Sequence, residues 1–116
     1  MGGIHRDVVL YATGPTYLAD VFAEAKPDDR LRDGQLTVTT KLGFAGAPQD
    51  GWSVETRLFD AEGREVLEAP LADRIKADPK GANPYRGALG RRVQTAEVTA
   101  PKLWSSETPY LYTVVV

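Results

Sequence analysis

The residues that could carry acid–base chemistry are carboxylates, because the chain has 16 Asp and Glu residues but a single histidine. Hydrolysis by two carboxyl groups needs the pair at a set separation across the scissile bond. Glu97 and Glu107 are the candidates for such a catalytic pair. Both, however, occur at positions where the strands of a β-sandwich expose polar side chains to water. We therefore interpret them as solvated surface groups and predict no catalytic residue in the chain.

Metal and nucleophile chemistry also lack suitable residues. His5 is the only histidine and there is no cysteine, so the usual zinc ligand sets and a Ser-His-Asp triad are not expected. Asp28, Asp29 and Asp33 form a loose acidic group without the ligand spacing of a calcium loop, which favours solvated turn residues. The glycines are scattered through turns and form no phosphate-binding loop. The sequence predicts no metal and no cofactor.

The stretch from Asp73 to Arg92 is the best candidate for an interaction. It shows no hydrophobic periodicity, and six basic residues stand in it against two acidic ones. A connection of this length is usually functional or disordered, so docking on an acidic partner and a mobile soluble loop both remain open. With one aromatic residue it lacks the stacking platform of a single-strand nucleic-acid binder. The candidate residues are Arg74, Lys76, Lys80, Tyr85, Arg86, Arg91 and Arg92.

The composition indicates one globular domain. The 116 residues are 42% hydrophobic and 26% charged, with a net charge of -2, which gives no electrostatic reason to expect nucleic acid or an anionic membrane as partner. No apolar run has the length of a membrane span, and no signal peptide is evident. The absence of cysteine fits a reducing compartment, so we expect a cytoplasmic protein.

Short alternating runs predict an all-β fold. The clearest is 35–44, where Leu36, Val38, Thr40, Leu42 and Phe44 share one face. A turn at 60–63, with glycine where a positive φ is needed, predicts a hairpin. The other predicted strands are 6–12, 16–26, 52–60, 64–71, 92–100 and 110–116, with Trp52 among the inward residues. About seven short strands separated by turns are typical of an antiparallel, immunoglobulin-like β-sandwich.

The stretch 101–116 also supports the prediction of an all-β fold. Leu103 and Trp104 form a bulky apolar pair that we assign to the core, because a Trp side chain nearly always packs against one. After Pro109, aromatic and β-branched residues alternate up to Val116, which predicts a strand buried on most sides. Since that run has no polar ending, we expect the chain to be a piece of a longer protein.

Two motifs resemble a known family. Residues 2–11 read Gly-Gly-Ile-His-Arg-Asp-Val-Val-Leu-Tyr, which is similar to a Gly-Ile-x-Arg-x-Val stretch in family 2 glycoside hydrolases. That stretch joins their sugar-binding domain to their immunoglobulin-like domain. Residues 101–112 resemble the Pro-x-Leu-Trp-Ser-x-Glu-x-Pro-x-Leu-Tyr stretch near the end of the latter domain. Within the family, the two motifs are most similar to those of β-galactosidases, and less similar to those of β-glucuronidases and β-mannosidases.

The resemblance implies that the whole chain, 1–116, is a single non-catalytic sandwich between a jelly roll and a (β/α)₈ barrel. In such enzymes the two catalytic glutamates lie in the barrel, so none is carried over to this chain. The expected partners are these neighbouring domains, and a second subunit is also allowed. The implied junction residues are Gly3, Ile4, His5, Arg6 and Val8, and the implied core motif is Leu103, Trp104, Pro109, Leu111 and Tyr112.

The alternative is a free-standing sandwich that binds protein or carbohydrate through its loops, with Trp52 or Tyr85 in the binding surface. Binding of galactosides or polysaccharides to the chain would favour this alternative. An enzyme in its own right has almost no support from the residues.

Overall fold

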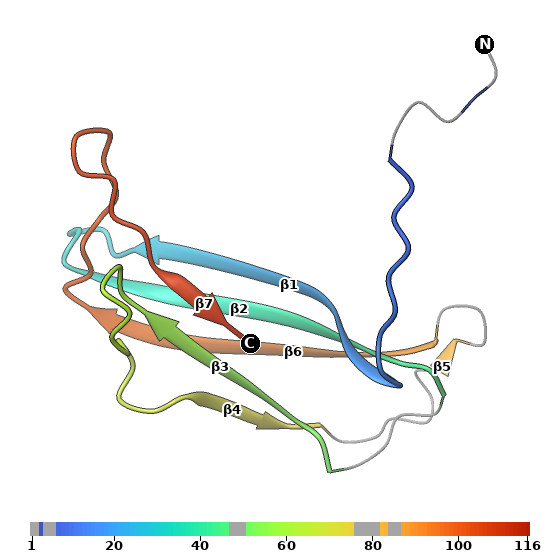
Figure 1. Ribbon diagram of the computed structural model, residues 1–116. Coiled ribbons are helices and arrows are strands. Elements are labelled where there is room, and N and C mark those ends of the chain that lie inside the picture. The colour runs from blue at the N-terminus through green and yellow to red at the C-terminus, as the bar shows by residue number, and fades with distance from the viewer. Residues whose placement is uncertain (1–2, 4–6, 47–50, 76–81, 84–86) are drawn as a thin grey trace.

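The computed structural model describes residues 3, 7–46, 51–75, 82–83 and 87–116 (Figure 1). All regular structure in these ranges is β-strand. They contain no helix that is long and apolar enough to span a membrane. The prediction of an all-β fold is therefore confirmed for the described part of the chain.

Four strands form the first sheet. β1 (Thr16–Pro27), β2 (Asp33–Phe44), β6 (Gly87–Thr99) and the two-residue β5 (Ala82–Asn83) lie in the order β1-β2-β6-β5. All pairings are antiparallel, and β2 pairs with β1 on one edge and with β6 on the other. The 12-residue β2 is thus the centre of the sheet.

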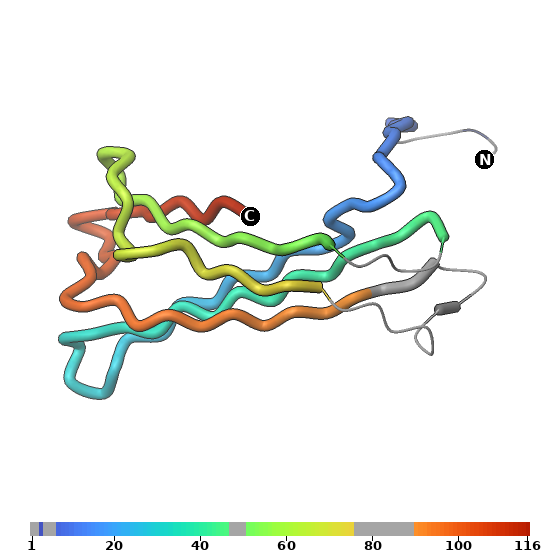
Figure 2. The backbone as a smooth tube through the Cα atoms, turned by 90° about the horizontal axis from the view of Figure 1, so that it is seen from below, coloured from blue at the N-terminus to red at the C-terminus, as the bar shows by residue number. Residues whose placement is uncertain are grey.

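The second sheet is smaller. β4 (Leu71–Arg74), β3 (Ser53–Phe59) and β7 (Thr113–Val115) lie in the order β4-β3-β7, again antiparallel. Figure 2 shows this layer stacked on the first. Two packed antiparallel sheets are compatible with an immunoglobulin-like sandwich.

The core lies where β2 faces β3. The five predicted inward residues of β2 are all buried, and Val54, Thr56 and Leu58 of β3 are buried opposite them. Alternate residues of a strand point to the same side, so one long apolar face on β2 is enough to fix which side is covered. The prediction from residues 35–44 is confirmed.

Three buried residues in this core are polar. Thr56 Oγ1 donates to Gln94 Oε1 at 2.7 Å, and Gln94 Nε2 donates to the carbonyl of Val54 at 3.3 Å. These bonds join β3 in one sheet to β6 in the other. Thr40 is fully buried too, but its Oγ1 has no hydrogen-bond partner among the described residues.

The predicted turn at 60–63 is confirmed. Gly63 has a φ of 78°, and its N–H donates to the carbonyl of Asp60 at 3.0 Å. Asp60 Oδ1 also accepts from the N–H of Arg64 at 2.8 Å. This backbone bond is the main cause that holds the pKa of the Asp60 carboxyl below its ordinary value.

Two strand predictions and one loop prediction were wrong. Residues 7–15 are extended but form no strand, because none of the described strands lies beside them to supply a ladder. The run 64–71 makes only one bridge, Phe59 to Glu65, and pairing resumes in β4. The stretch 73–92 is not one continuous loop, since β4 extends to Arg74 and β6 begins at Gly87.

The outer parts of the predicted core also differ. Trp52, predicted to point inward, is exposed beside the start of β3. The final strand is only half-buried: Val114 and Val116 pack on the core, whereas Leu111 and Val115 are exposed. The predicted number of about seven strands is not established, because β5 has only two residues and the expected strand at 6–12 is missing.

Candidate functional site

The segment between β6 and β7 carries the longer of the two sequence motifs. It leaves β6 at Ala100, whose φ of 46° is in the left-handed region, and the Ala100 N–H donates to Asp33 Oδ1 at 3.0 Å. That bond supports a backbone conformation that a non-glycine residue rarely adopts. The segment then projects from one end of the sandwich instead of passing between the sheets (Figure 1).

The assignment of the whole motif to the core was therefore wrong. Trp104 is 62% exposed, and Leu103, Pro109 and Leu111 are exposed as well. Of these residues only Tyr112 packs against the core, on the cluster formed by Leu36, Val38, Leu58 and Val98. The size of a Trp side chain predicts that something covers it, but within this chain nothing described does.

Tyr112 fixes the base of the projecting segment. Its hydroxyl accepts a hydrogen bond from the N–H of Lys102, ten residues upstream, at 2.8 Å. A tyrosine just before a strand whose hydroxyl bonds upstream backbone is the tyrosine corner of immunoglobulin-like sandwiches. Tyr110 packs edge-on against Tyr112 with ring centroids 5.2 Å apart, and the Lys102 ammonium lies 4.4 Å from the Tyr110 ring centroid.

Tyr110 also ties the segment to the turn after β3. Its hydroxyl donates to Glu62 Oε2 at 2.7 Å and accepts from the N–H of Ala61 at 3.2 Å. Arg64 Nη2 lies 3.1 Å from the same carboxylate oxygen. Sequence reasoning missed this network, although a tyrosine directly after Pro109, opposite an acidic turn, was the available signal.

The tip of the segment is a closed turn. The N–H of Ser105 donates to the carbonyl of Thr108 at 3.2 Å, and the two hydroxyls are 2.9 Å apart. Ser106 Oγ donates to Glu107 Oε1 at 2.8 Å, and this bond is the main cause that lowers the pKa of the Glu107 carboxyl. A fully ionised, exposed carboxylate bound to local hydroxyls is a surface group, as predicted, and Glu97 is exposed on β6.

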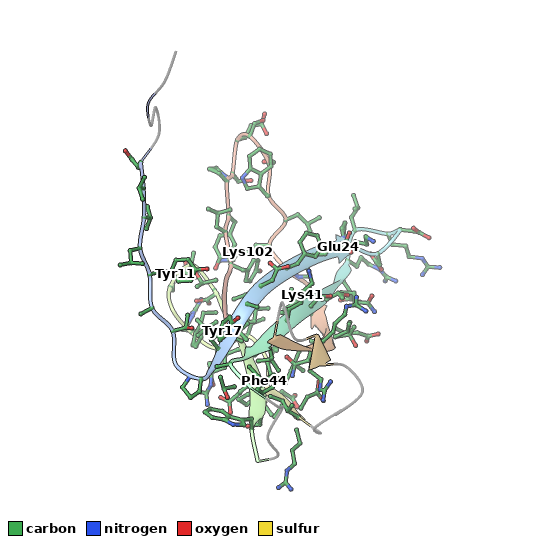
Figure 3. All side chains as sticks on the ribbon, turned by 90° about the vertical axis from the view of Figure 1, so that its right-hand side faces the viewer. Tyr11, Tyr17, Glu24, Lys41, Phe44 and Lys102 are labelled. Carbon is green, nitrogen blue, oxygen red and sulfur yellow. The ribbon has the colours of Figure 1, made fainter. Side chains whose placement is uncertain are left out.

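A second exposed apolar segment precedes β1. Residues 7–15 extend away from the sheets, with Leu10 97% exposed and Val8 and Tyr11 also largely exposed (Figures 1 and 3). We call residues 7–15 the arm. Of the predicted junction residues, Gly3 is exposed, and Ile4, His5 and Arg6 lie outside the described residues.

The structure does not gather the predicted basic residues into one described patch. Arg74 is on β4, and Arg91 and Arg92 are neighbours on β6, so their side chains point to opposite faces of the first sheet. The other four, Lys76, Lys80, Tyr85 and Arg86, lie outside the described residues.

The acidic group near residue 30 accepts hydrogen bonds from backbone N–H groups. Asp28 Oδ1 accepts from the N–H of Arg32 at 2.7 Å, and Asp33 Oδ1 accepts from Ala100. Both carboxylates thus stabilise the local backbone conformation, as solvated turn residues commonly do.

Comparison with known proteins identifies the family of the chain. Residues 16–116 match the sequence profile of Glycosyl hydrolases family 2. The chain belongs to this family. It is 31% identical over 116 residues to the beta-galactosidase of Priestia megaterium and 34% identical over 118 residues to that of Photobacterium profundum. The alignments cover 99% and 100% of this chain, but the chain spans only about a tenth (10%) of the length of each of these relatives.

Solved structures agree on the fold. A putative beta-galactosidase from Bacteroides fragilis superposes with a TM-score of 0.64 at 25% identity, covering 81% of this chain and 13% of that one. The apo structure of Bacteroides uniformis beta-glucuronidase 3 gives 0.63 at 20% identity, covering 88% and 10%. In this family the chain therefore corresponds to one small all-β part of much larger proteins.

Proposed function

We propose that the chain is a non-catalytic, immunoglobulin-like domain of a β-galactosidase-type glycoside hydrolase. The parent protein would hydrolyse terminal β-galactosides with residues located outside this chain. The role of the domain would be to hold a sugar-binding jelly roll and a catalytic barrel in fixed relation. Catalysis depends on such positioning, because a small displacement of active-site walls can cost a large factor in rate.

One observation carries this proposal: large apolar side chains are exposed at both ends of a well-formed sandwich. Leu103 and Trp104 lie on a segment whose base and tip are fixed by hydrogen bonds, and Val8 and Leu10 lie on the arm. Contiguous exposed apolar groups mark interaction surfaces, and covering them would stabilise the assembly by about 25 cal/mol per Å². A neighbouring domain at each end would provide that cover.

The strand order supports the immunoglobulin-like assignment. β1, β2, β6 and β5 fit the A, B, E and D positions of such a sandwich, with β3 and β7 at C and F. Tyr112 then stands at the corner before strand F, where these folds place their characteristic tyrosine.

This arrangement of the domain also suggests which residues would contact its neighbours. Gly3, Ile4, His5, Arg6 and Val8 would meet the jelly roll, and Leu103, Trp104 and Leu111 would meet a neighbouring domain at the opposite end. A parent that works in the cytoplasm would be consistent with the absence of cysteine.

The experiment compares Trp104→Ala in the 116-residue chain and in the parent protein. In the chain we expect a loss below about 0.5 kcal/mol, as for surface substitutions generally, because Trp104 is mostly exposed. In the parent we expect a loss of about 2 kcal/mol or more, as for a buried interface anchor. Phe22→Ala is the matched control, because Phe22 is 61% exposed but lies on a regular strand.

Equal small losses for Trp104→Ala in both proteins would refute the proposed contact. Binding of galactosides by the 116-residue chain itself, measured by calorimetry, would instead favour a free-standing binding module.

A further inference from the structure

The first sheet has one side that faces away from the second sheet. β3 and β7 pack on the side of β2 that carries Leu36 and Val38 (Figure 2). We call the opposite side of β1, β2 and β6 the outer face. Residues directly opposite each other in an antiparallel pair point to the same side, so the strand pairing fixes which residues it carries. They form four rows, each with one residue from β1, β2 and β6 in turn: Asp20, Lys41 and Arg91; Phe22, Thr39 and Val93; Glu24, Thr37 and Thr95; and Lys26, Gln35 and Glu97.

One row of the outer face carries no charge and two exposed hydrophobic side chains. Phe22 is 61% exposed and Val93 is 45% exposed, and Thr39 lies half-buried between them. Single exposed hydrophobic residues are normal on a protein surface, but these two lie in one row across three strands. Charged residues flank the row in both directions along the strands. An apolar centre with a polar rim is the usual composition of a protein–protein contact.

The charges around this row are balanced. The four rows contain three acidic and three basic residues, so their net charge is zero. Along β1 the residues of the face are acidic, aromatic, acidic and basic, whereas along β6 they are basic, aliphatic, neutral polar and acidic. Figure 3 labels two of the charged residues, Glu24 and Lys41. The two outer strands of the face are therefore complementary to each other in charge.

A second copy of the chain can use this complementarity if a two-fold axis runs along β2. Rotation about that axis places β1 of each copy over β6 of the other, and each row meets the same row. Asp20 then faces Arg91 of the second copy, and Lys26 faces Glu97 of the second copy. Because a two-fold contact uses the same surface on both copies, each of these pairs occurs twice. Sheets stack about 10 Å apart with their strands within about 30° of each other, a separation that long side chains span.

The other two-fold arrangement of stacked sheets is less favourable. An axis that crosses the strands at the row of Phe22 would place β1 over β1, so that Asp20 would face Glu24 of the second copy with like charge. With the axis along β2, the residues on the axis meet their own copies, and Lys41 is the charged one among them. Its ammonium is drawn from the axis toward β1 by the 2.9 Å ion pair with Asp20.

We infer that the outer face binds a second copy of this chain, with β1 of each copy over β6 of the other. Two strand spacings are about 10 Å and the six residues from Asp20 to Lys26 span about 20 Å, so each copy would bury roughly 400 Å² with its side chains included. This is about half of what each partner buries in a standard interface. We therefore expect weak association, with a dissociation constant between about 10 µM and about 1 mM. The contact is independent of the proposed function, because it uses neither end of the sandwich.

Sedimentation equilibrium of the 116-residue chain over this concentration range measures the association. Phe22→Asp places a carboxylate opposite Val93 at two symmetric positions, so it should raise the dissociation constant at least about tenfold. Leu31→Asp is the matched control, because Leu31 is 64% exposed but lies in the turn between β1 and β2, outside the outer face. It should leave the dissociation constant within about twofold of the original value.

Charge reversal tests the orientation of the two copies. Lys26→Glu or Glu97→Lys alone places like charges opposite each other at two symmetric positions, so each should weaken association at least about threefold. The double variant restores opposite charges and should return the dissociation constant to within about twofold of the original. Far-ultraviolet circular dichroism confirms that each variant retains its β-structure.

Three results would overturn the inference. The first is a chain that stays monomeric over the whole concentration range. The second is an equal effect of Phe22→Asp and Leu31→Asp, since association would then use another surface. The third is loss of association in both single charge reversals without recovery in the double variant. In unfolding experiments at about 1 µM protein a contact this weak is dissociated, so Phe22→Ala remains a control for Trp104→Ala.

Discussion

Two buried threonines on facing strands allow one chemical change to be tested with opposite expected results. Thr56 and Thr40 are both 0% exposed. Thr56 Oγ1 is hydrogen-bonded to Gln94 Oε1 at 2.7 Å, whereas Thr40 Oγ1 has no partner among the described residues. Replacing either residue by valine substitutes a methyl group for a hydroxyl of similar size.

The magnitudes follow from what each valine leaves behind. Thr56→Val leaves the buried Gln94 Oε1 unsatisfied, and such a group costs about 1–3 kcal/mol. Thr40→Val removes a buried hydroxyl that gains no bond in the folded state, so we expect stabilisation by about 1 kcal/mol. The two variants should therefore differ by about 2–4 kcal/mol.

The assay is urea unfolding of the 116-residue chain at 25 °C, followed by circular dichroism and analysed by linear extrapolation. Gln94→Leu provides a double-mutant cycle with Thr56→Val, because leucine removes the group left unpaired. The coupling energy should be close to the cost of Thr56→Val alone. Equal effects of the two valine variants, or destabilisation by Thr40→Val, would refute the description of this polar core.

Three further predictions concern the edges of the sandwich. Gly43→Ala would place a Cβ inside the Tyr17 ring, so it should cost about 1–3 kcal/mol in urea unfolding, and Tyr17→Ala should relieve most of that cost; an equal cost in both backgrounds would exclude the clash. Because the pKa of Asp60 is lowered in the folded state, its contribution is present at neutral pH and lost as the pH falls below about 4. The melting temperature of Asp60→Asn should consequently fall less than that of wild type in this range, and parallel curves would argue against the effect. Tyr112→Phe removes the acceptor of the Lys102 N–H and should cost about 0.5–1.5 kcal/mol, whereas no loss in calorimetric stability would mean that the corner bond is not needed.

The sequence was sufficient where one element alone determines the outcome. The apolar face of residues 35–44 decides which side of β2 is buried, and the glycine at 63 decides the turn after β3. Both features are local, so no knowledge of the neighbours was required.

Sequence reasoning failed where the outcome depends on a neighbour. The stretch 73–92 has no hydrophobic periodicity and is predicted to be a loop, but the ladder from β2 holds residues 88–92 as part of β6. Trp104 was assigned to the core because of its size, yet it lies on a projecting segment. Residues 7–15 alternate like a strand without a described partner to pair with. In each case burial or pairing is decided by elements that a single-strand pattern does not contain.

The most direct test of the central claim is hydrolysis of nitrophenyl β-galactoside by two purified proteins, the 116-residue chain and the longer parent protein. We expect turnover by the parent and none by the chain, because in the proposed function the catalytic carboxyl pair lies outside the chain. Turnover by the 116-residue chain itself would contradict the account.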